Sequence, residues 1–72
     1  MLIKLTGHRT DLPVLVESDA IIAAEETTDI YNNGGKFTRL ILMAENNQTG
    51  VNVKETCDEI LEEISDSAEG LL

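Results

Sequence analysis

The stretch FTRLILMA at residues 37–44 decides the fold, because its run of five apolar residues, 40–44, makes it the strongest strand of the chain. Successive side chains of a strand point to opposite faces, so Leu40 and Leu42 share one face. The other face carries Phe37, Arg39, Ile41 and Met43. A strand buried on one face alternates apolar with polar residues, whereas this one is apolar on both. Its second face is therefore expected to meet either a helix of this chain or another chain.

Two further strands precede this stretch, at residues 1–6 and 12–17, with Ile3 and Leu5 on one face of the first. A polar cluster of turn type separates them, so they are expected to pair as an antiparallel hairpin. Residues 18–28 are ambiguous. Helix formers after Ser18 favour a helix over 18–27, while Thr27 and Thr28 favour a strand. We expect one helical turn at 18–20 and a strand from 21 to about 27, with the full helix as the alternative.

Turn signals delimit the remaining strands. The Asn-Gly pair in residues 29–36 suits a tight hairpin turn, because it supplies positive φ angles. Residues 45–50 read as a second polar turn, and residues 51–55 as a short alternating strand.

A helix ends the chain. Thr56 and Glu59 form a capping box, and an apolar stripe follows at helical spacing: Cys57, Ile60, Leu61, Ile64 and Ala68. The helix is expected to dock through Ile60, Leu61 and Ile64. The domain is expected to span 1–66, with residues 67–72 as a frayed tail.

The order of these elements predicts an α+β domain. Strand runs separated by turns come first, and the helical period appears only at the end. The expected architecture is a small, mostly antiparallel sheet of four or five strands with one C-terminal amphipathic helix. A barrel-like closure of the sheet stays open as an alternative.

Composition excludes several classes of function. The chain of 72 residues has a formal net charge of −9, which argues against direct nucleic-acid binding. No apolar run approaches the roughly 20 residues of a membrane span, and no basic stretch followed by an apolar run marks a signal peptide. The lone cysteine fits a reducing compartment, so the chain is expected to be cytoplasmic.

The sequence offers little for catalysis. His8, the one histidine, falls in an expected turn and reads as a solvated residue. Cys57 would be a reactive thiol at a helix start, but its place on the apolar stripe favours a buried small hydrophobe. Adjacent carboxylates on a helix do not face each other as a catalytic pair would. We therefore predict no enzyme activity, no catalytic residues, no cofactor and no metal site.

Three segments resemble a known family: Ile3-Lys4-Leu5-Thr6, then Val16-Glu17-Ser18-Asp19-Ala20-Ile21-Ile22, then Val53-Lys54-Glu55-Thr56 before Asp58-Glu59-Ile60. In this order, over about residues 2–64, they are similar to the small bacterial flagellar and swarming-motility proteins of the FlbD/SwrD type. The stretch 28–37 is longer than that family's hairpin, and Thr56 stands where the family has serine. The resemblance implies a cytoplasmic, non-enzymatic protein that acts through other proteins.

The sequence therefore leaves two alternative hypotheses for the function. The first is a protein-binding or self-associating module whose candidate interface is Phe37, Arg39, Ile41 and Met43. The second is an acidic inhibitor that mimics nucleic acid and occupies a basic groove. It rests on seven carboxylates, with no lysine or arginine, in residues 55–69.

Overall fold

The computed structural model describes residues 1–31 and 34–69, with side chains to residue 66. The chain begins with strands β1 (Leu2–Thr6) and β2 (Pro13–Glu17), and a 3-10 turn, η1 (Ser18–Ala20), follows them. Next come β3 (Ile21–Asp29), β4 (Gly35–Ala44) and β5 (Asn47–Val53), and the helix α1 (Cys57–Glu69) ends the described chain. The expected helical turn at 18–20 followed by a strand is confirmed, and the alternative helix over 18–27 is wrong.

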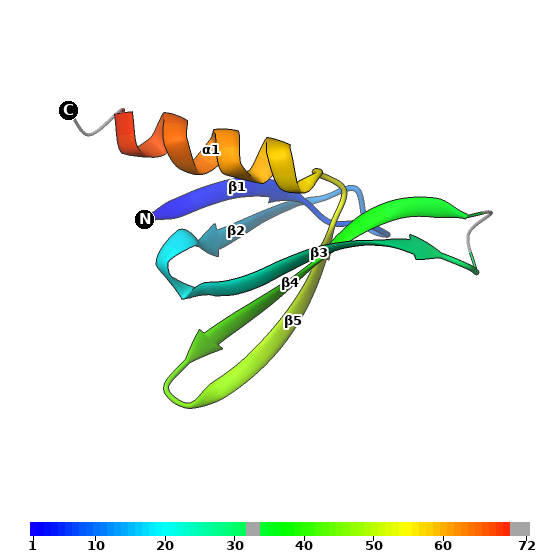
Figure 1. Cartoon of the computed structure of the whole chain (residues 1–72), viewed down its shortest axis with the longest axis horizontal. Helices are drawn as coiled ribbons and strands as arrows, with labels where there is room; N and C mark the ends of the chain where they lie inside the picture. The colour runs from blue at the N-terminus through cyan, green and yellow to red at the C-terminus, as the bar shows by residue number, and fades with distance from the viewer. Residues whose placement is uncertain (32–33, 70–72) are drawn as a thin grey trace.

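The strands form two antiparallel sheets rather than one. β1 pairs with β2, and β3, β4 and β5 form a three-stranded sheet with β4 in the centre. In Figure 1 the helix lies along β1, while the β4–β5 turn extends away from it. The α+β class and the antiparallel pairing are confirmed. The barrel-like alternative is not found, because the described strands leave both sheets open.

The two sheets are joined where β1 ends and β5 ends. A bridge pairs Gly7 with Val53, and the amide of Lys54 donates to the carbonyl of Thr6 at 2.8 Å. The Glu55 carboxylate accepts from both the amide and the hydroxyl of Thr6, at 2.8 and 3.0 Å. The opening and closing segments that carry the family resemblance are therefore in direct contact.

The core lies between the two sheets and the helix. Its buried apolar side chains come from four strands and the helix: Ile3, Leu5, Val16, Leu40, Val53 and Ile60. Ile3 and Leu5 face inward as the alternation in residues 1–6 predicts. Thr38 is also buried, and its hydroxyl donates to the carbonyl of Glu55 at 2.6 Å. A core this small stabilises a domain only marginally.

The helix begins as its sequence predicts, but it docks through fewer residues than expected. The Thr56 hydroxyl accepts from the Glu59 amide at 3.1 Å, and the Glu59 carboxylate accepts from the Thr56 amide at 2.9 Å. Ile60 is buried and Ile64 half-buried, whereas Leu61 is 61% exposed. The prediction for Leu61 is therefore wrong. Leu61 lies about 100° around the helix from Ile60, outside the narrow stripe that reaches the core.

The turn between β4 and β5 is shorter than predicted. β5 starts at Asn47 and ends at Val53, so the polar turn predicted at 45–50 reduces to Glu45 and Asn46. Both residues have positive φ, 49° and 71°, the geometry that matches the twist of a two-residue hairpin. Asn47, Gln48 and Thr49 lie in the strand, although polar composition favoured a turn.

Two predictions, the frayed C-terminal tail and the Asn-Gly turn, concern residues that the structure does not describe. The helix is assigned to Glu69, beyond the expected domain end at 66, while residues 70–72 of the expected frayed tail lie outside the described residues. Asn32 and Asn33 of the predicted Asn-Gly turn also lie outside them. Within residues 1–31 and 34–69, no helix is long and apolar enough to cross a membrane.

Candidate functional site

The candidate interface residues lie on one face of β4, as predicted. The outward face is defined here as the face of the β3–β4–β5 sheet that carries Phe37, Arg39, Ile41 and Met43. Leu40 lies on the opposite, core face with the helix residue Ile60. The β1–β2 hairpin and the helix therefore cover the core face together, and a different element covers one end of the outward face.

That element is the loop after β1. The His8 ring stacks on the Phe37 ring, with 4.4 Å between the ring centroids and 20° between the planes. The His8 amide also donates to the Asn52 carbonyl at 3.0 Å, which holds the loop against β5. The expectation of a solvated His8 is wrong, because its side chain is only 7% exposed. Phe37 is half-buried beneath it, so the uncovered part of the outward face begins at Arg39.

Asp29, at the end of β3, holds this loop in place. Its carboxylate contacts His8 Nε2 at 2.9 Å and accepts from Arg9 Nη2 at 3.3 Å. The Tyr31 amide donates to the other carboxylate oxygen at 3.0 Å. The Asp29 side chain is 4% exposed, so a buried carboxylate is satisfied by three partners from two loops.

These contacts change the pKa of the Asp29 carboxyl group. The hydrogen bond with His8 contributes most to lowering the pKa of the Asp29 carboxyl below its ordinary value. Burial opposes this shift, while the Tyr31 amide and Arg9 add to the lowering of the pKa. The charged carboxylate is thus the form that this arrangement stabilises.

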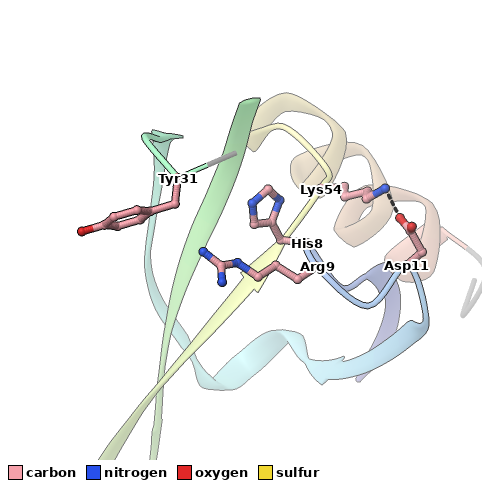
Figure 2. A pocket seen from close by; sticks show the side chains of 5 residues that line it. All are labelled: His8, Arg9, Asp11, Tyr31 and Lys54. Atoms are coloured by element: carbon pink, nitrogen blue, oxygen red, sulfur yellow. Dashed lines mark ion pairs between the residues drawn. The ribbon is translucent and has the colours of Figure 1, made fainter. Parts of the chain in front are cut away.

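An open depression of about 370 Å³ lies beside the Asp29 cluster and is lined by His8, Arg9, Asp11, Tyr31 and Lys54. Figure 2 shows Lys54 and Asp11 as an ion pair on one side, and Tyr31 extending outward on the other. Both cations in the depression therefore already have a carboxylate partner. Among the described residues, no three His, Cys, Asp or Glu side chains gather into a group that could hold a metal ion.

The uncovered part of the outward face is partly apolar. Ile41 is half-buried, Met43 is 38% exposed, and Arg39 is exposed. A Cβ placed on Gly50 would lie 3.7 Å from Arg39 Nε, so the arginine side chain lies over this glycine. On β3, Ala23 pairs with Ile41 and Glu25 pairs with Arg39, so both also belong to the outward face.

The outer side of the β1–β2 hairpin is a second exposed apolar surface. Leu2 is 59% exposed and Leu15 64% exposed, and the register places both on the side of the hairpin away from the core. This surface was not among the candidate interfaces predicted from the sequence.

The pairing of His8 with Asp29 was not predicted from the sequence. These residues are 21 positions apart, and they meet because the bridge between Gly7 and Val53 and the hydrogen bond from the His8 amide to the Asn52 carbonyl hold the loop against β5. Cys57, expected to be buried, is half-buried, and its thiol donates to the Ala24 carbonyl at 3.7 Å.

Comparison with known proteins finds no match to a protein family, to a curated protein or to a solved structure.

Proposed function

We propose that this chain is a small, acidic, non-enzymatic module that binds protein by self-association through the uncovered outward face. The observation that carries the proposal is the exposure of Met43 and the partial exposure of Ile41 on a sheet face that the helix does not cover. The proposal agrees with the resemblance to proteins of the FlbD/SwrD type, which implies a cytoplasmic protein that acts through other proteins.

The size of the molecular surface supports this proposal. The accessible surface is 5232 Å², whereas a compact monomer of this mass is expected to have roughly 4,400 Å². The excess of roughly 800 Å² means that the two open sheets leave more surface in water than an average monomer of this mass does. The radius of gyration, 12.4 Å, also exceeds the roughly 11 Å expected for a compact domain of this length.

The distribution of charge supports a defined assembly rather than open-ended association. The exposed side of the helix carries carboxylates and no basic residue: Asp58, Glu59, Glu62, Glu63 and Asp66. Like charges repel, so copies that met through this side would be destabilised. The outward face, which contains Arg39, carries no such concentration of negative charge.

Sedimentation equilibrium tests the proposal with the full chain. We expect the wild-type protein to have a mass above that of the monomer, and Ile41→Lys to reduce it to the monomer mass. A charge at the centre of an apolar contact is desolvated without a partner, which destabilises the complex. Leu15→Lys is the matched control, because it places the same charge on an exposed strand residue of the other sheet.

Circular dichroism confirms that each variant keeps its fold. A wild-type protein that stays monomeric at high concentration would contradict the proposal. So would an Ile41→Lys variant that keeps both the native spectrum and the wild-type mass.

A further inference from the structure

We propose that the partner on the outward face is a second copy of this chain, related by a two-fold axis that runs parallel to the strands between β3 and β4. This inference rests on the proposed self-association and specifies its geometry. In this arrangement Arg39 of each copy pairs with the partner's Glu25.

The register of β3 and β4 is the starting point. Glu25 is directly opposite Arg39, and Ala23 is directly opposite Ile41. Residues directly opposite each other in an antiparallel pair point to the same face. The outward face therefore holds a cation beside an anion and, next to them, a large apolar residue beside a small one.

A two-fold axis between β3 and β4 stacks each β3 on the partner's β4. Arg39 then faces the partner's Glu25, and Ile41 faces the partner's Ala23. Both contacts occur twice, because an interface of this symmetry uses the same patch on both copies. Opposite charges meet, and each large side chain meets a small one, as close sheet packing at about 10 Å requires.

The alternative positions of the axis leave Arg39 without an anion. An axis along β4 places Arg39 over the partner's Arg39. An axis between β4 and β5 places Arg39 over the partner's Asn52 and leaves the guanidinium desolvated without a carboxylate, which is costly. An axis perpendicular to the strands stacks each strand on its own copy, so β4 never faces β3. Charge complementarity therefore selects the first arrangement.

The environment of Arg39 and Glu25 leaves them available for this contact. Both side chains belong to exposed residues, and among the residues that the structure describes neither takes part in an ion pair within the chain. Arg39 lies over Gly50, which presents no side chain that would hold it there. The His8 loop covers the Phe37 end, so it limits the interface to the part of the face from Arg39 to Met43.

Charge reversal in trans tests this arrangement. Arg39→Glu and Glu25→Arg are prepared separately, and the dimer dissociation constant of each is measured by sedimentation equilibrium. We expect each variant alone to dissociate at least tenfold more readily than the wild type, because like charges then meet at both of the symmetry-related contacts beside the axis. An equimolar mixture is expected to recover a dimer of near wild-type affinity, since every contact between the two chains then joins opposite charges.

The mixture separates contacts between chains from contacts within a chain. In each variant residues 25 and 39 carry the same sign, so mixing restores no attraction inside either chain. The neutral variants Arg39→Gln and Glu25→Gln test the same contact without a like-charge pair in one chain, and each should weaken the dimer several-fold. Circular dichroism reports the fold of all four.

The outcomes distinguish this inference from the proposed function. If the wild type dimerises and Ile41→Lys dissociates it, but the charge variants keep the wild-type dissociation constant, the two-fold arrangement is wrong and self-association stands. A mixture that stays monomeric would also overturn the arrangement. A monomeric wild type would overturn both.

Discussion

The two faces of β4 are built from the same run of apolar residues but are covered in different ways. On the core face, Leu40 is completely buried by both sheets and the helix. On the outward face, one histidine covers Phe37, and Met43 remains exposed. The difference shows that hydrophobicity within a strand does not decide which face becomes the core. The connections before and after the strand decide where the covering elements lie.

The largest expected effect compares single truncations on the two faces. Leu40→Ala removes a fully buried side chain and should lower the free energy of unfolding by roughly 2–5 kcal/mol. Met43→Ala should lower it by about 1 kcal/mol or less, because part of the side chain is already in water. Urea denaturation under monomeric conditions measures both. Equal losses would mean that the outward face is packed as tightly as the core face.

The next comparison concerns the helix that covers the core face. Ile60→Ala should lower the free energy of unfolding by roughly 2–4 kcal/mol, since Ile60 is buried. Its neighbour Leu61 is the matched control, and Leu61→Ala should change stability by only about 0.5 kcal/mol. Thermal melts of the two variants check the result. A large loss for Leu61→Ala would place this residue in the core, as the sequence analysis expected.

A smaller effect is expected at the start of the same helix. Thr56→Ala removes the hydroxyl that accepts from the Glu59 amide and should cost about 1 kcal/mol. Ser65→Ala, at an exposed position inside the helix, is the control and should not destabilise, because alanine is the better helix former. Urea denaturation measures both variants. If Thr56→Ala has no effect, the capping box does not stabilise the helix α1.

The smallest effect is a pH dependence of the free energy of unfolding, and it arises where Asp29 holds the His8 loop over the outward face. The pKa of Asp29 is lowered in the folded state, so the stabilisation that its charged carboxylate provides is fully present above the ordinary pKa of about 3.8. It is lost as the pH falls through the lowered folded pKa. Asp29→Asn does not titrate, so it should lose less stability than the wild type between neutral pH and about pH 3.

Asp66→Asn is the control for this pH dependence, because Asp66 lies on the exposed side of the helix. Its stability should follow the wild-type curve. If Asp29→Asn also follows that curve, the contact with His8 does not bias the titration of Asp29. In that case the His8 loop is held over Phe37 by the stacking contact and the backbone hydrogen bond alone.

Most of the local structure was predictable because it depends on neighbours in the sequence. The alternation around Ile3 and Leu5, the strand after Ala20, and the Thr56–Glu59 capping box each involve residues within a few positions of each other. The start of β5 was not predictable in the same way. Asn47, Gln48 and Thr49 have turn-like composition, but pairing with β4 holds them in a strand.

The candidate site was only partly predictable. Alternation alone places Phe37, Arg39, Ile41 and Met43 on one face, and the register with β3 and β5 agrees with it. The cover of Phe37 by His8 was not predictable, because residues 29 positions apart in the sequence meet there. No pattern of spacing in one sequence indicates such a contact.

The sequence by itself determined the class of fold, the inward side chains of the first hairpin and the beginning of the helix, because each depends on periodicity or on a contact within one turn. Only the tertiary structure decided that Leu61 stays in water, that Glu55 holds Thr6, and that Asp29 fixes His8 over one end of the outward face. The contacts of Glu55 and of His8 depend on how the two sheets meet at Gly7 and Val53. That junction forms between distant segments, and its free energy comes from burying them together rather than from the preferences of either segment alone.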